Sequence, residues 1–164
     1  MQNQYPEFKD NKYNTYIVGH ARVFDRRTQM FKRIDEVCIG DELTAFNENS
    51  TRECGVVLRI VKYTPSEVVP LYIGCITKYH PINRLKKHFE FAGTHQGSPD
   101  GSTCAPMYAI LLEKGVFGLV VEGLNCITLG HSIQNSIAAH PYFGTDLVRD
   151  DILARPVVRG YVCV

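Results

Sequence analysis

Six cysteines are the most reactive side chains in this sequence of 164 residues, and they lie at positions 38, 54, 75, 104, 126 and 163. Zinc sites need ligands at characteristic close spacings. No Cys-x-x-Cys pair occurs, and five residues separate the closest cysteine and histidine pairs, Cys75 with His80 and Cys126 with His131. The sequence therefore indicates neither a metal nor a cofactor. We expect reduced thiols, because no signal peptide accompanies a disulfide framework.

Several residues whose side chains could take part in catalysis also have a plain structural interpretation. Taken alone, Thr77 and His80 are a strand threonine and a histidine before a proline. We expect Cys126 to be a small buried thiol, because free cysteine packs as a small apolar side chain. His131 is expected to be a polar partner within the C-terminal part of the chain. A catalytic role for any of these residues needs support from the sequence around it.

Short apolar or alternating runs, separated by glycine, asparagine and proline, predict an all-β fold. Glycine in the turn at residues 113–115 predicts a hairpin between the last two of these runs. Residues 93–102 are the part of the chain richest in turn-forming residues such as Gly, Ser, Pro and Asp, which predicts an exposed loop. The expected strands cover residues 16–18, 21–24, 56–63, 68–76, 107–112 and 116–121.

The length of the chain favours one domain over two. Residues 1–13 are polar and rich in Asn, Gln and Lys, which indicates a loosely ordered leader. We expect the β domain to cover residues 14–131, with a C-terminal extension over 132–164 that packs on the same domain. Apolar residues recurring at about one helical turn predict a helix over 145–154, which Pro156 would end.

The balance of charge limits the partners that the sequence favours. Lys and Arg number 18 and Asp and Glu number 17, so the formal net charge is +1. This excess offers no general attraction to nucleic acid or to an anionic membrane surface. The basic cluster of Arg84, Lys86, Lys87 and His88 lies next to Glu90, so we interpret it as a solvated strand end. No run approaches the ~18 apolar residues of a membrane helix, and a cytoplasmic location is expected.

Three groups of residues occur in an order that resembles one protein family. The first group combines Gly19-x-x-x-Val23 with the segments Phe31-Lys-Arg-Ile-Asp-Glu-Val37 and Gly40-Asp41-Glu42-Leu43. The second is Thr77-Lys-Tyr-His80-Pro, and the third is Cys126-Ile-Thr-Leu-Gly-His131 with His140-Pro-Tyr-Phe-Gly144. In this order, over residues 16–144, they resemble a Hint domain, the fold of hedgehog proteins and inteins. The third group is similar to the Vint subgroup, which is attached to von Willebrand A domains.

The resemblance implies a horseshoe-like β fold that cleaves its own chain. In a Hint domain a cysteine thiol attacks the preceding carbonyl and converts that peptide bond into a thioester. A threonine and a histidine assist this step, one by positioning the peptide and the other as a general acid. By this resemblance Thr77 has the positioning role and His80 donates a proton to the departing amide nitrogen. Cys126 and His131 match the end of the subgroup's motif and are further candidate site residues.

The attacking cysteine of the family's Cys-Phe-x-Gly motif falls on Tyr16, counted back from Gly19. A phenol with an unperturbed pKa near ~10 is a poor nucleophile for acyl transfer at neutral pH. Thr15 could serve only if the register shifts by one residue, which in a strand also turns its side chain to the other face. The His-Asn pair that inteins use for cyclisation falls on Ile127-Thr128, so splicing is not expected.

Three functions remain open from the sequence. The first is an autoprocessing domain that has lost self-cleavage and acts as a structural or interaction module, meeting protein partners through a von Willebrand A-containing host. The second is an active domain that cleaves its own flanking chain near residue 16, using Thr15, a displaced residue or a cysteine that Tyr16 has replaced. The third is an unrelated β-barrel that binds a ligand or partner through its nine Tyr and eight Phe side chains. A structure that places Thr77 and His80 far from Tyr16 would favour the third.

Overall fold

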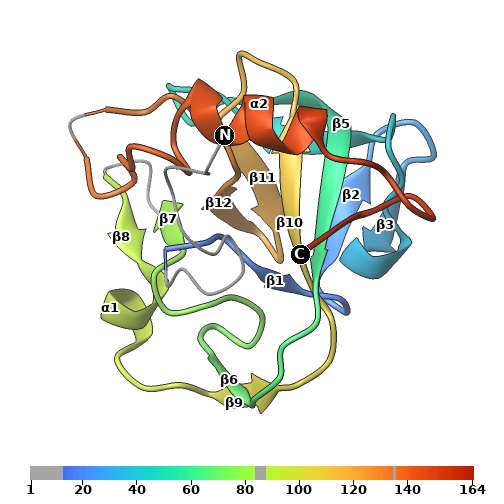
Figure 1. Ribbon diagram of the computed structural model, residues 1–164. Coiled ribbons are helices and arrows are strands. Elements are labelled where there is room, and N and C mark those ends of the chain that lie inside the picture. The colour runs from blue at the N-terminus through green and yellow to red at the C-terminus, as the bar shows by residue number, and fades with distance from the viewer. Residues whose placement is uncertain (1–12, 84–87, 135) are drawn as a thin grey trace.

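Antiparallel strands dominate the computed structural model, which describes residues 13–83, 88–134 and 136–164 (Figure 1). The all-β expectation is confirmed. The strands form one strongly curled sheet of 11 strands and a separate sheet of two. They are β1 Ile17–Val18, β2 Arg22–Asp25, β3 Met30–Arg33, β4 Glu42–Phe46, β5 Arg52–Tyr63, β6 Val69–Leu71, β7 Pro81–Asn83, β8 Glu90–Phe91, β9 Gly101–Thr103, β10 Met107–Leu112, β11 Gly118–Val121, β12 Leu124–Ile127 and β13 Val162–Cys163. The helices are a 3-10 turn Ile34–Glu36, α1 Ala92–Gln96 and α2 Asp146–Ala154.

The long strand β5 joins the two halves of the curled sheet. Its first part pairs antiparallel with β4, and its second part pairs antiparallel with β10. The main path of the sheet runs β1-β10-β5-β4-β2-β11-β12-β7-β8, while β3 pairs with β2 and β13 lies parallel to β5. A break in the regular register falls between Leu111 and Leu112, where β10 follows the curl of β5.

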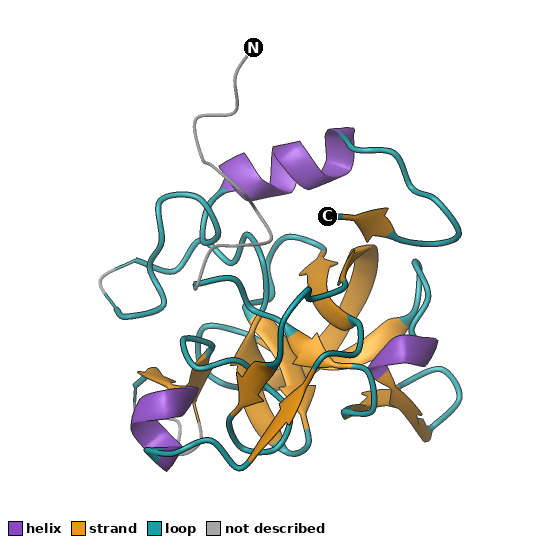
Figure 2. Ribbon diagram, turned by 60° about the horizontal axis from the view of Figure 1, so that its bottom comes forward, coloured by secondary structure: helices purple, strands orange, loops and turns teal. Residues whose placement is uncertain are grey.

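Side chains inside the curl form one main core. Strands β10, β11 and β12 are buried along their whole length, which explains their nearly continuous apolar sequences. Helix α2 lies across one end of the curled sheet (Figure 2) and contributes Val148 and Ile152, both fully buried, to the same core. Thr145 caps the helix, because its hydroxyl accepts a hydrogen bond from the Leu147 N–H. The helix ends before Pro156, as the sequence predicts. No helix among the described residues is long and apolar enough to cross a membrane.

The hairpin expected around residues 113–115 does not form. Gly115 has the positive φ of a turn, 103°. However, β10 lies between β1 and β5, while β11 pairs with β12, β2 and β4. Both edges of each strand are therefore occupied by other partners. The turn carries the chain from one half of the curled sheet to the other. Turn residues determine where the chain reverses direction, but they do not determine which strands pair with each other.

Two further local expectations need correction. Residues 93–102 are not simply an exposed loop, because α1 covers their first part and β9 pairs with β6 at their end. The expected strand over 68–76 is shorter, because Ile73 and Gly74 adopt positive φ values of 55° and 73° and turn the chain after β6. Residues 1–12 of the predicted leader lie outside the described residues, as do Arg84, Lys86 and Lys87 of the basic cluster.

Candidate functional site

The candidate site is built around the segment where the chain enters the sheet. Asn14, Thr15 and Tyr16 are buried there, immediately before β1. The Val18 N–H donates to the Cys75 carbonyl at 2.9 Å, and Ile17 forms a bridge with Ile76. These backbone contacts bring the segment that contains Thr77 and His80 alongside the entering peptide.

Thr77 and His80 both reach this buried peptide. The Thr77 hydroxyl donates a hydrogen bond to the Asn14 carbonyl, with 3.3 Å between the oxygens. His80 is completely buried, and its ring nitrogen Nε2 lies 2.9 Å from the carbonyl oxygen of Ile127 in β12. The Tyr16 backbone also interacts with this ring. The structure therefore joins Tyr16, Thr77 and His80, and this proximity counts against an unrelated β-barrel.

The protonation of His80 follows from its surroundings. Burial lowers the pKa of His80 from 6.5 to about 4, although the backbone groups of Ile127 and Tyr16 favour the protonated ring. The ring is therefore neutral at neutral pH. Since the Ile127 carbonyl can only accept a hydrogen bond, Nε2 holds the proton and the buried Nδ1 keeps a lone pair. Such a ring must first accept a proton at Nδ1 before it can act as the general acid that the resemblance implies.

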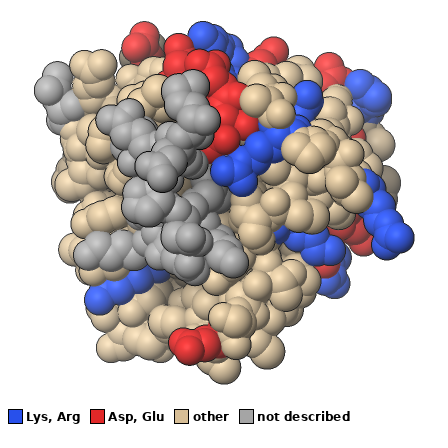
Figure 3. Space-filling view, in the orientation of Figure 1, with Lys and Arg blue, Asp and Glu red and all other residues tan. Residues whose placement is uncertain are grey.

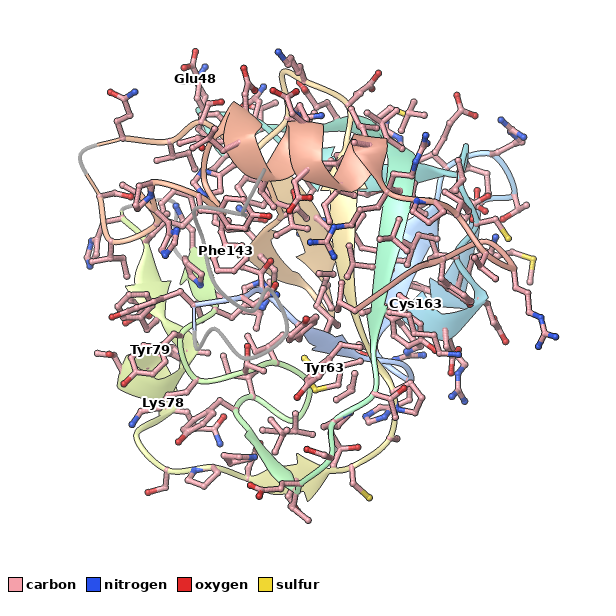
Figure 4. The ribbon with its side chains drawn as sticks, viewed as in Figure 1. Glu48, Tyr63, Lys78, Tyr79, Phe143 and Cys163 are labelled. Carbon is pink, nitrogen blue, oxygen red and sulfur yellow. The ribbon has the colours of Figure 1, made fainter. Side chains whose placement is uncertain are left out.

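Tyr16 occupies the expected position of the nucleophile but is packed as a core residue. Its ring stacks on Tyr63 with 4.8 Å between centroids and an interplanar angle of 22°. Tyr63 is the last residue of β5 (Figure 4), where it pairs with Met107 of β10, which in turn pairs with Val18 of β1. The stacking partner could not be found from sequence, because nothing in the local pattern connects the end of β5 with the entering peptide.

Thr15 lines a cavity of about 250 Å³ beside the entering peptide. Its Oγ1 atom is buried and has no hydrogen-bond partner within the described part of the chain. The polar lining also includes Thr128 and His131, and aromatic rings form much of the remaining wall. These rings are Tyr13, Tyr79, Phe91 and Phe143. The cavity therefore places a buried hydroxyl near groups from the C-terminal part of the chain.

His131 and His140 line the same cavity and are held by backbone hydrogen bonds. The Nδ1 atom of His131 accepts from the Ile133 N–H at 2.9 Å, and that of His140 accepts from Tyr142 and Phe143 at 3.1 and 3.0 Å. Burial lowers the pKa of His131 to about 4 and also lowers that of His140. His131 is thus a neutral ring at neutral pH, and its Nδ1 atom holds the loop after β12 through the Ile133 N–H.

Cys126 lies in the interior of β12 and is fully buried. Burial raises the pKa of its thiol well above the ordinary value, and it raises the pKa of the Cys75 thiol to about 12. A protonated thiol is a poor nucleophile, so these buried cysteines do not replace the missing one. Among the residues that the structure describes, no group of His, Cys, Asp or Glu side chains is gathered as a metal site.

A curled antiparallel sheet that holds a threonine and a histidine against its entering peptide defines a Hint-type domain. Comparison with known families agrees with this class. The family model named Vint and described as a Hint-domain matches residues 18–163, so the chain belongs to the Vint family of Hint domains. The match begins after Tyr16 and does not include the nucleophile position. No curated protein matches the chain.

Proposed function

We propose that this Vint-family domain does not cleave the bond before Tyr16 and acts as a structural or interaction module in a longer protein. The observation that carries the proposal is the placement of the Tyr16 ring, which is buried against Tyr63. The motif position that supplies the nucleophile in the family is thereby used for core packing.

The chemistry of an acyl shift supports this proposal. A cysteine, serine or threonine attacks its own preceding carbonyl by closing a small ring through the amide nitrogen, Cα and Cβ. The tyrosine oxygen stands at the far end of a rigid aromatic ring, so it cannot close that ring on the Thr15 carbonyl. A phenol is also a weaker nucleophile for acyl transfer than a cysteine thiolate. Thr77 and His80 then order the entering peptide, but no nucleophile is present for them to assist.

A mass measurement tests the proposal directly. A reporter protein is fused before Met1, and the intact mass is recorded after incubation with and without hydroxylamine or a small thiol. We expect a single species of full mass under every condition. A fragment that begins at residue 16 would contradict the proposal.

Returning the missing thiol is the sharper form of this test. Tyr16→Cys should gain thiol-dependent cleavage between Thr15 and residue 16, because Thr77 and His80 contact the backbone on either side of this bond, at Asn14 and at Tyr16. Tyr16→Ala is the matched control, since it opens similar space without a thiol and should remain intact. Adding His80→Ala to Tyr16→Cys should slow cleavage by about 10²- to 10⁴-fold. If Tyr16→Cys folds, judged by circular dichroism, and stays intact, the inherited helper site is not functional.

One hydrogen bond favours a second candidate function, which is self-cleavage before Thr15. The hydroxyl of Thr77 donates to the carbonyl of Asn14, which is the carbonyl that Thr15 would attack. The Thr15 oxygen would bond to that carbon, the Asn14–Thr15 amide bond would break, and the hydroxyl proton would be transferred to the freed nitrogen of Thr15. The product is an ester that hydroxylamine cleaves. A fragment beginning at Thr15 in the wild type, absent from Thr15→Val, would support this candidate.

A further inference from the structure

We infer that the outer face of β2, β3, β4, β5 and β11 binds an acidic peptide segment of a partner protein that includes an apolar side chain. This inference gives a partner class to the interaction role proposed above and rests on that role. It concerns a separate surface, because the groove on this face and the cavity beside Thr15 have no lining residue in common.

Alternation along the strands produces a groove of about 410 Å³ on this face. In β2, Val23 and Asp25 point inward and are buried, which directs Arg22 and Phe24 outward. Neighbouring strands and the turn after β2 complete the lining. The residues that matter for recognition are Arg22, Phe24, Arg26, Phe31, Arg52 and Glu122. Basic side chains lie on the side of the molecule that contains β2 and β3 (Figure 3).

The groove has an excess of positive charge. Arg22 is partly compensated, because its Nε lies 3.8 Å from the Glu122 carboxylate. Arg26 and Arg52 are exposed and form no ion pair with any other described residue. Two guanidinium groups are therefore available at one surface. Each offers a planar set of donors that can bind a carboxylate through two hydrogen bonds.

An exposed phenylalanine, packed on a half-buried one, lies among these guanidinium groups. Phe31 is 66% exposed, which is high for so large an apolar side chain. It packs edge-on against Phe24, with 5.3 Å between ring centroids, and the Arg22 guanidinium lies 5.6 Å from the Phe31 centroid. Exposed aromatic rings beside arginines are typical of the residues that dominate binding energy at protein interfaces.

These features favour a peptide over a nucleic acid. A single-stranded nucleic acid needs a continuous basic track along its backbone, and the whole chain has a net charge of only +1. Glu122 lies in the groove beside Arg22, which compensates its charge. The groove's positive charge that is unpaired among the described residues is therefore confined to Arg26 and Arg52 and does not form such a track. A carboxylate placed beside Arg26 and Arg52, with an apolar side chain against Phe31, matches the two unpaired guanidinium groups and the exposed ring.

The test uses a fluorescein-labelled peptide of alternating Asp and Glu around one central Phe. One matched peptide has Lys in place of each acid, and another has Ala in place of Phe. Fluorescence anisotropy should show saturable binding of the acidic Phe peptide and weaker binding of the other two. Higher salt should weaken the binding, because exposed charge pairs are screened. The backbone amide signals that shift in NMR spectra should belong to β2, β3 and the turn between them.

Variants of the groove give the decisive comparison. Arg26→Glu combined with Arg52→Glu should lower the affinity by about tenfold or more, and Phe31→Ser should lower it by about threefold or more. Arg159→Glu is the matched control and should leave the affinity unchanged, because Arg159 is exposed and does not line the groove. Circular dichroism checks that each variant is folded.

Three results would overturn the inference. They are no saturable binding of the acidic peptide, equal weakening by Arg159→Glu, and tighter binding of a thymidine oligonucleotide than of the peptide. The mass assay detects cleavage of the chain and does not depend on the groove residues, so its result is independent of peptide binding. A failure of peptide binding is therefore distinguishable from cleavage at Tyr16, which would instead contradict the proposed function.

Discussion

At the scale of single residues, the buried histidines make the stability of this domain sensitive to acid. Burial lowers the pKa values of His80 and His131 from 6.5 to about 4 in the folded chain. Between these two values the unfolded chain binds more protons than the folded chain. The free energy of unfolding therefore falls as the pH drops from about 6.5 to about 4.

His80→Gln should reduce this loss of stability in acid. A shift of this size corresponds to roughly 3 kcal/mol per histidine at full extent, and the variant removes the contribution of His80. Urea unfolding between pH 7 and pH 5 measures the slope. His20→Gln is the control, because His20 is exposed and should leave the slope unchanged. An unaltered slope in His80→Gln would refute this origin of the acid sensitivity.

The sequence could predict that Thr77 and His80 lie near the entering peptide, but not the geometry of their contacts. Thr77 and His80 could be found because their spacing belongs to a recognisable motif, and the structure places both at the entering peptide. The stacking of Tyr16 on Tyr63 could not be found, since it depends on how far the sheet curls. The same holds for the partner of Thr77, which is the carbonyl of Asn14 and not that of Thr15.

At the scale of elements, the close approach of β11 and β12 depends on a glycine. A Cβ atom at Gly118 would lie 2.0 Å from the carbonyl oxygen of Cys126, which is far inside contact distance. We expect Gly118→Ala to destabilise the domain by more than about 3 kcal/mol or to prevent folding, because backbone must move. Gly101→Ala should change stability by less than about 1 kcal/mol, since no described residue other than its chain neighbours has an atom within 4 Å of the Cβ position. Thermal unfolding of both variants measures the difference.

Helix α2 is attached to the sheet through a buried arginine. Arg149 donates to the Leu112 carbonyl at 2.8 Å and to the Gly130 carbonyl at 3.3 Å. Arg149→Met should lower the free energy of unfolding by about 2–4 kcal/mol, because two buried carbonyls lose their donor. Arg155→Met provides the comparison and should cost at most about 1 kcal/mol, since the ion pair of Arg155 with Asp151 is partly exposed. Urea unfolding at neutral pH measures both values.

Local sequence patterns predicted these elements to different extents. Helix α2 could be predicted because its apolar period, its threonine cap and the following proline all agree. Strand β3 could not be predicted from alternation, because its sequence Met-Phe-Lys-Arg lies mostly exposed on the outer face. The failed hairpin at residues 113–115 has a different cause, since the partners of β10 and β11 are set by the curl of the whole sheet.

At the scale of the whole molecule, one core connects the sheet with the C-terminal part of the chain. The main cluster of buried side chains contains Val61 from β5, Leu111 from β10 and both Val148 and Ile152 from α2. Strand β13 also returns from the end of the chain to pair with β5. A chain with one shared core is expected to unfold as one cooperative unit.

The predicted packing of residues 132–164 on the β domain can therefore be tested by cooperativity. Native-state hydrogen exchange should give similar opening free energies for the amides of Val61 in β5 and Ile152 in α2, because both lie in the shared core. Arg149→Met should lower the opening free energy at both amides by the same amount. If it lowered only the value for Ile152, the C-terminal extension would be a separate unit that opens while the curled sheet remains folded.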